Sequence, residues 1–335
     1  MARTLPATPD PATSRSGRAG TLAVVTHLVD VDTGYRCSPW TQAQGVDPIG
    51  SAGQLDELLL VEWPLPSPAD VSEVAELAEV AADPRARLML VVPQADAWEA
   101  DGLARVVHHR RVGTHRLAGI DHRVPRAEVP TLLAALLDST GAEAAAWPSA
   151  VGPAPPEVLV CAHGRRDPCC GRFGTLLHVE LAARVPEVRV WRCSHTGGHR
   201  FAPTAITLPD GRAWAYADVD LIEQVVSRSG PVGDLAPHDR GGLAFDPWAQ
   251  VVDRALLAEH GWAWLDHEVV EASTQVREDA ATVTLRWRAP DGGTGTTRAE
   301  VEVARTLPIL VCGEPPEAAT KISPEYRLRA IEHGR

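Results

Sequence analysis

Two short motifs, one rich in cysteine and one rich in histidine, each follow a predicted buried strand. Val158–Ala162 and Val188–Cys193 have the length and apolar content of such strands. Gly174–Val185 between them has helical periodicity. In a parallel strand–helix–strand unit, both strand ends open on the same edge of the sheet. The sequence therefore predicts an α/β fold that brings the two motifs together.

Four side chains of these motifs follow the spacing C-x8-C-x24-H-x3-H, namely Cys161, Cys170, His195 and His199. Two thiolates and two neutral imidazoles are a suitable set of four metal ligands. Glycines inside the histidine motif allow a sharp turn and a close approach of the backbone to a bound group. The motifs therefore predict a metal centre.

The other cysteines are interpreted differently. Adjacent side chains usually point apart, so only one of Cys169 and Cys170 is expected to bind, and Cys170 is favoured because it precedes Gly171. Cys193 is expected to be a buried strand residue, since free cysteine is often buried. The two remaining cysteines, Cys37 and Cys312, are expected to serve packing.

The metal itself is left open by the spacing. Two cysteines and two histidines with a short His-x3-His interval also form a structural zinc pattern. An iron–sulfur cluster and a zinc ion are therefore both compatible with the motifs. Thiol–disulfide exchange is disfavoured, because no C-x-x-C stands at the start of the helix.

The order of predicted elements repeats along the chain. The first half shows a strand, a helix, three further strands and a closing helix, and the second shows a strand, a helix, three strands and a closing helix. The first-half elements are expected at Glu57–Trp63, Ala69–Ala82, Arg87–Val92, 104–110, 115–121 and Glu128–Leu137. This order is typical of thioredoxin-like layers, so two of them in tandem are predicted, followed by a small C-terminal α+β segment.

The order of elements and the local composition together divide the chain into four predicted segments. The N-terminal residues, rich in Ala, Thr, Pro, Ser and Arg, are expected to form a disordered leader. A Pro/Gly-rich linker is expected at Pro148–Pro156, and a polar tail at Pro315–Arg335. The predicted boundaries are 1–34 for the leader, 35–147 for a first half without ligands, 156–232 for the half with the metal centre, and 236–335 for the C-terminal domain and tail.

Charge and hydropathy exclude two classes of partner. The net charge is −12, so the chain lacks the basic surface that nucleic-acid binding requires. The longest apolar runs are far too short to span a bilayer, and the N-terminus lacks the apolar segment of a secretory signal. A cytoplasmic protein without nucleic-acid or membrane partners is therefore expected.

The two motifs together resemble the sucrase/ferredoxin-like family, a group of thioredoxin-like [2Fe–2S] proteins. The resemblance covers roughly residues 35 to 230, and Arg36-Cys37-Ser38 and Pro48–Trp63 are similar to the family's N-terminal start. The matching motif residues are Cys161-x-His163-Gly164-x-Arg166-Asp167-x-x-Cys170-Gly171 and His195-x-Gly197-Gly198-His199. The combination of both motifs is specific, whereas neither alone would be.

The resemblance implies a thioredoxin-like ferredoxin domain whose [2Fe–2S] cluster is bound by the two cysteines and two histidines of the C-x8-C-x24-H-x3-H pattern. Other motif residues would then surround the ligands without binding iron: His163, Arg166, Asp167, Gly197 and Gly198. Positive charge from Arg165, Arg166 and Arg192 is expected to stabilise the reduced cluster.

The function implied is electron transfer. No strand-linked G-x-G-x-x-G is present for a flavin or nicotinamide, so the redox partner, a reductase or an electron acceptor, is expected to be a separate protein. The family name also implies sucrose cleavage, but no carboxylate pair for such a reaction is found, so no enzymatic activity is expected. A zinc-stabilised structural or binding module with the same four ligands is the alternative.

Overall fold

A computed structural model describes residues 35–93 and 102–334, so the predicted leader lies outside the described residues. Its main element is a mixed ten-stranded sheet with the strand order β10-β9-β8-β6-β7-β2-β1-β3-β4-β5. The strands are β1 (Glu57–Glu62), β2 (Arg87–Val91), β3 (Leu103–Val112), β4 (Arg116–Pro125), β5 (Ala150–Pro153), β6 (Glu157–Cys161), β7 (Arg189–Cys193), β8 (Ala205–Leu208), β9 (Arg212–Trp214) and β10 (Asp239–Gly242).

The two halves of this sheet have the same pairing pattern. In the first half, β1 pairs with β2 in parallel and with β3 antiparallel, and β3 pairs with β4. In the second half, β6 pairs with β7 in parallel and with β8 antiparallel, and β8 pairs with β9. The halves join where β2 meets β7 antiparallel, with Val91 opposite Cys193. The two halves therefore share one continuous sheet.

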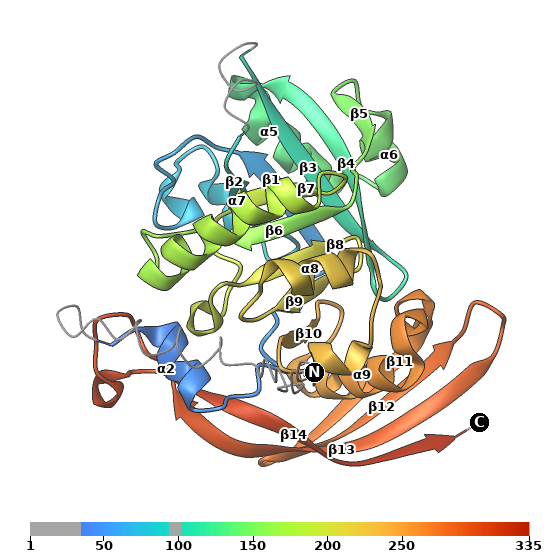
Figure 1. Cartoon of the computed structure of the whole chain (residues 1–335). Helices are drawn as coiled ribbons and strands as arrows, with labels where there is room; N and C mark the ends of the chain where they lie inside the picture. Colours follow the sequence, from blue (N-terminus) through green and yellow to red (C-terminus); the bar gives the residue numbers. More distant parts are fainter. Residues whose placement is uncertain (1–34, 94–101, 335) are drawn as a thin grey trace, which may run out of the picture.

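Helices cover the outer faces of the two halves, and the inner faces share a core (Figure 1). Alternate residues of a strand point to opposite faces. Leu59 of β1 accordingly packs with α3 (Ala78–Ala81) and α5 (Val129–Asp138). Its neighbour Leu60 shares a core with Leu159 of β6. In the second half, the outer face packs against α7 (Thr175–Arg184) and α8 (Val219–Val226).

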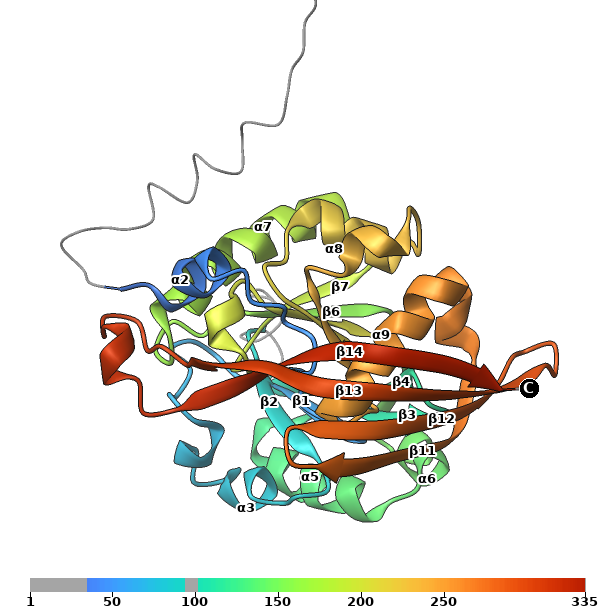
Figure 2. The ribbon, with the colours of Figure 1, turned by 90° about the horizontal axis from the view of Figure 1, so that it is seen from below.

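The C-terminal part forms a second, antiparallel sheet of four long strands, which lies below the large sheet in Figure 1 and across the viewer's side in Figure 2. Apolar residues of α9 (Pro247–His260) pack against this sheet. The strands are β11 (Glu268–Arg277), β12 (Ala280–Arg288), β13 (Thr294–Pro308) and β14 (Ile322–Gly334). None of the helices in the described part of the chain is both long and apolar enough to cross a membrane.

Three expectations at the level of single elements are wrong. The predicted polar tail contains β14, which pairs with β13 and packs Tyr326 and Leu328 against the core around α9. The predicted linker contains β5, which adds to the open edge of β4, and the Thr140-capped helix α6 (Gly141–Ala146) precedes it. The helix predicted at Ala69–Ala82 is reduced to a 3-10 turn and the short α3.

Candidate metal centre

The cysteine motif and the histidine motif meet at the carboxyl ends of β6 and β7. These strands are parallel, and their last residues, Cys161 and Cys193, lie opposite each other. The loop after β6 returns to the strand end at Cys170, which begins a short π-helical turn before α7. Gly174 closes this turn so near to Cys161 that any side chain there would overlap the carbonyl oxygen of Cys161. The glycine therefore allows Cys170 to lie beside Cys161.

The thiol of Cys161 is fully buried among hydrogen-bond donors. It interacts first with Cys170, and also with the His195 side chain and the backbone amides of Thr196 and His163. These contacts hold the pKa of Cys161 well below its usual range, although burial acts in the opposite direction. Cys170 is also fully buried. The thiolate is the form in which a cysteine binds metal.

The two histidines lie in the loop that follows β7 and are less deeply buried than these thiols. The ring centroids of His195 and His199 are 6.4 Å apart. Nδ1 of His199 lies 3.1 Å from Oδ2 of Asp167, and this contact leaves Nε2 available to a metal. Among the described residues, none makes a hydrogen bond with the buried Nδ1 of His195. This nitrogen is therefore free to bind a ligand.

Two arginines contact the backbone of the histidine loop. Arg87 donates from Nη2 to the carbonyl oxygen of His195 over 2.5 Å, and Arg240 donates from Nη1 to that of Gly197 over 3.1 Å. Within the two described ranges, neither arginine forms an ion pair with a carboxylate. Burial lowers the pKa of Arg240 to about 10. The predicted ligands therefore lie beside two arginines that have no carboxylate partner in the described ranges.

Gly198 makes this arrangement possible. Its φ is +68°, a left-handed conformation that favours glycine. A Cβ at this position would lie 2.5 Å from Nη2 of Arg240. Glycine in the histidine motif thus provides both the turn and the space for the buried guanidinium.

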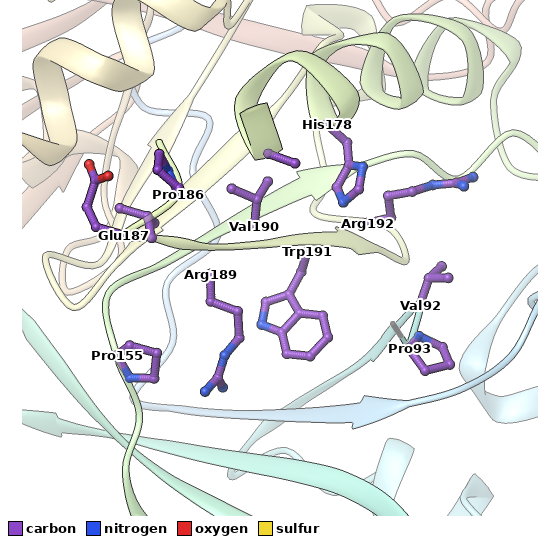
Figure 3. A pocket seen from close by; sticks show the side chains of 12 residues that line it. Val92, Pro93, Pro155, His178, Pro186, Glu187, Arg189, Val190, Trp191 and Arg192 are labelled. Atoms are coloured by element: carbon purple, nitrogen blue, oxygen red, sulfur yellow. The ribbon is translucent and has the colours of Figure 1, made fainter. Parts of the chain in front are cut away.

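The arginines singled out in the sequence have other contacts. Arg166 forms an ion pair of 3.2 Å with Asp70, and Arg165 donates to a nearby carbonyl of the same segment after β1. Arg192 lines a separate cavity with His178 of α7 (Figure 3). The arginines that donate hydrogen bonds to the carbonyl oxygens of His195 and Gly197 are therefore Arg87 and Arg240, and not these three.

His163 supports the cysteine loop from the side. Its ring is buried, and Nε2 lies 2.8 Å from the carbonyl oxygen of Pro68. Its own backbone amide points to Cys161. The residue therefore connects the predicted ligand strand to the segment that follows β1.

A second group of possible metal ligands lies directly beside the first. One donor atom each from Cys37, Asp167, Cys169 and Cys312 lies within 4.8 Å of all the others. Hydrogen bonds from Cys169 and Cys37 lower the pKa of Cys312 to about 2. Sγ of Cys169 lies 3.3 Å from Sγ of Cys312, so Cys169 belongs to this second group. Its neighbour Cys170 interacts with Cys161 instead.

Sequence reasoning missed this second group. Cys37 and Cys312 were expected to serve packing, and they are separated from each other by 275 positions. The only available signal was the similarity of Arg36-Cys37-Ser38 to a family motif. Cys193 behaves as expected for a buried strand residue and packs in the core shared by the two halves.

An open cavity of about 460 Å³ lies over the histidine side of the centre. It separates the histidine loop from the segment between β13 and β14. The side chain of His199 is 22% exposed, whereas Cys161 and Cys170 are fully buried. The residues that line the cavity include Arg166, Asp167, His195, His199, Arg200 and Lys321.

The comparisons with known proteins agree with the motifs. The sucrase/ferredoxin-like family matches residues 41–240, which is more than half of the 335 residues and includes both motifs. No curated protein and no solved structure matched the chain. The extent of the family match shows that this chain belongs to the sucrase/ferredoxin-like family.

Proposed function

We propose that Cys161, Cys170, His195 and His199 bind a [2Fe–2S] cluster and that the protein transfers single electrons between other redox proteins. The observation that carries this proposal is that two buried thiols lie together at one of two adjacent parallel strand ends, where Cys161 also interacts with the His195 side chain of the loop after β7. A cluster bound there would accept and release one electron. Membership of the sucrase/ferredoxin-like family supports the same conclusion.

The donor atoms are prepared for metal binding. Hydrogen bonds favour the thiolate of Cys161, and Nδ1 of His199 lies 3.1 Å from Oδ2 of Asp167 and 3.4 Å from Sγ of Cys37. A carboxylate on one ring nitrogen fixes the tautomer and orients the other nitrogen towards a metal. The unpartnered Nδ1 of His195 offers a second nitrogen ligand.

The surrounding charge suits a site that becomes negative on reduction. Two ferric ions, two sulfides and two thiolates have no net charge, and one added electron gives −1. Arg87 and Arg240 would stabilise that negative charge, since neither is paired with a carboxylate in the described part of the chain. Histidine ligands and nearby positive charge both raise the reduction potential of such a cluster.

The open cavity beside the two histidines favours exchange of electrons with a partner protein on that side of the site. The cysteines are fully buried, and the two histidines line the open cavity. A partner protein that covers this cavity would approach the imidazole ligands and not the thiolates. Arg166 and Lys321 on the cavity wall would favour acidic groups on the partner surface.

The proposal assigns the thioredoxin-like ferredoxin fold to the half between 156 and 232. The supporting observation is its parallel pair β6–β7 with α7 between them, followed by the β8–β9 hairpin and α8. We propose no sucrose cleavage and no other catalysis for this site. A cytoplasmic location also remains a prediction from the sequence.

Metal and sulfide analysis tests the assignment. The full-length protein, purified without oxygen, should be red-brown and contain two iron atoms and two acid-labile sulfides per chain. His195→Cys and His199→Cys should keep iron, because cysteine also binds it. Cys161→Ser should lose both iron and colour, whereas Cys193→Ser, a matched change at the opposite strand end, should keep them.

The zinc alternative gives a different result in the same measurements. A colourless protein with one zinc, lost in Cys161→Ser, would mean that the four residues form a structural zinc site. Such a result would overturn the proposed electron transfer.

A further inference from the structure

The four donors of the second group come from distant parts of the chain. Cys37 is the first residue of α2 (Cys37–Ala43), and Cys312 lies in the segment between β13 and β14. Asp167 and Cys169 lie in the loop that also carries Cys170. Figures 1 and 2 both show α2 beside the segment between β13 and β14. All four donors are buried or half-buried.

The distances between the donor atoms are short and similar. Sγ of Cys312 lies 3.3 Å from Sγ of Cys169 and 3.4 Å from Sγ of Cys37. Oδ1 of Asp167 lies 3.6 Å from Sγ of Cys37 and 3.6 Å from Sγ of Cys312. The four atoms therefore surround a common point.

These distances are close to those around one tetrahedral zinc ion. Zn–S bonds of about 2.3 Å and a Zn–O bond of about 2.0 Å place two sulfurs about 3.8 Å apart and a sulfur and an oxygen about 3.5 Å apart. The sulfur–oxygen pairs match these values, and the sulfur pairs need to move apart by about 0.4 Å. A binuclear cluster fits less well, because donors on different irons must lie farther apart than donors on one ion.

The donor types also select zinc among common ions. Zinc binds both cysteine sulfur and carboxylate oxygen in closed sites of four ligands, whereas calcium and magnesium prefer oxygen ligands alone. A disulfide is a poorer explanation, because three thiols converge and a disulfide would use only two. The sulfur pairs are also well beyond the 2.05 Å or so of an S–S bond.

We propose that Cys37, Cys169, Cys312 and Asp167 bind one structural zinc ion. Two of the donors, Cys37 and Cys312, lie outside the region that matches the family. The site is therefore formed by the family region together with the segments on both sides of it, and it does not depend on the identity of the metal at Cys161.

The zinc ion would fix two elements that have little structure of their own. The helix α2 has seven residues, and isolated helices of that length are not stable in water. The segment at 309–321 contains only the 3-10 turn η7 (Pro316–Ala318). Bonds from both elements to one ion would hold them against the cysteine loop.

Asp167 connects the two centres. Its Oδ1 accepts hydrogen bonds from the backbone amides of Cys169 and Cys170, and its Oδ2 contacts His199. A zinc ion bound to this carboxylate would keep it in place for its contact with His199. The zinc site therefore positions residues around the predicted cluster without contributing a ligand to it.

Site-specific metal analysis tests the proposal. The full-length protein, purified without chelators, should contain one zinc in addition to any iron. Cys312→Ser and Cys37→Ser should each lose at least nine-tenths of this zinc and keep the metal bound at Cys161. The matched control Cys193→Ser, also a buried cysteine, should keep both metals.

X-ray absorption at the zinc edge tests the same proposal on the wild-type protein, so the result does not depend on whether a variant folds. The wild-type protein should show three sulfur neighbours and one oxygen or nitrogen neighbour around zinc. Two sulfurs and two nitrogens would place the zinc at the histidine motif and overturn the proposal. It would also be overturned by wild-type protein that contains no zinc and takes up none when Zn²⁺ is added, or by Cys312→Ser protein that keeps its zinc.

Discussion

The two halves of the large sheet share one pairing pattern but differ in their chemistry. The strands β6 and β7 end in Cys161 and Cys193 and lead into the cysteine and histidine motifs. The equivalent strands β1 and β2 end in Glu62 and Val91 and are followed by no cysteine or histidine ligand in the described residues up to Pro93. The same strand arrangement therefore occurs with the predicted ligands in one half and without them in the other.

The half without ligands supports the half that has them. Because β2 and β7 run antiparallel, Arg87 at the start of β2 lies beside the histidine loop that follows β7. The segment after β1 also contacts the cysteine loop through Pro68 and Asp70. The difference shows how one half of a repeated architecture can provide ligands while the other provides charge and anchoring contacts.

The largest expected effect follows from removing a thiol of the second half. Cys170→Ser should abolish cluster binding, because a fully buried serine hydroxyl cannot replace the thiolate. The measurement is iron and sulfide content with visible absorbance. Cys169→Ser, at the adjacent position, should keep the iron, and equal loss in both variants would contradict the separation of the two centres.

Gly198→Ala tests how closely the histidine loop packs against the buried arginine. We expect a loss of about 2 kcal/mol in the free energy of unfolding, because alanine is strained at positive φ and its Cβ would meet Arg240. Urea denaturation measures the change. The control is Gly233→Ala, where a Cβ meets no atom within 4 Å. Equal stability of both variants would contradict this account of Gly198.

Arg240→Met tests the contribution of buried positive charge to the centre. The reduction potential should fall by about 50 mV, equivalent to roughly 1 kcal/mol for one electron. Protein-film voltammetry of the variant and of Arg240→Lys, which keeps the charge, measures the effect. An unchanged potential in Arg240→Met would show that the arginine has a packing role only.

The smallest effect is expected at the contact between Asp70 of the first half and Arg166 of the second. Hydrogen bonds from Ser72 and then the charge of Arg166 lower the pKa of Asp70. A lowered carboxyl pKa stabilises the folded protein above the ordinary value of 3.8, and this stability is lost as the pH falls through the lowered pKa. Since Asp70 and Arg166 are half exposed, Asp70→Asn should cost at most about 0.5 kcal/mol at pH 7.

Urea denaturation of wild type and Asp70→Asn at pH 7 and pH 3 measures this difference, which should shrink at the lower pH. A cost above about 1 kcal/mol at pH 7 would mean that the first half contributes more to the cysteine loop than an exposed ion pair can.

Much of the order of strands and helices along the chain could be predicted, because apolar runs such as those of β1 and β6 indicate buried strands. The joining of the two halves could not be predicted, because nothing in either sequence segment indicates that Val91 pairs with Cys193. The strand β14 was missed because none of its side chains is fully buried and because its pairing depends on β13.

The motifs identified the region of the centre but not all of its surroundings. Local spacing could not reveal that Arg87 and Arg240, and not Arg165 and Arg166, contact the histidine loop, because both lie far away in the sequence. The same limit hid the convergence of Cys37 with Cys312. Contacts between distant segments can be identified only once the fold is known, whereas pairs of ligands within one loop can be identified from their spacing in the sequence.

The central claim is mixed cysteine and histidine ligation of a [2Fe–2S] cluster, and electron paramagnetic resonance of the reduced full-length protein tests it most directly. Two histidine ligands should give a lower mean g value than four cysteines do, as expected from the different charge at the irons. His195→Cys and His199→Cys should each shift the mean g upwards. A reduced protein without a paramagnetic signal, or a spectrum unchanged in both variants, would contradict the assignment.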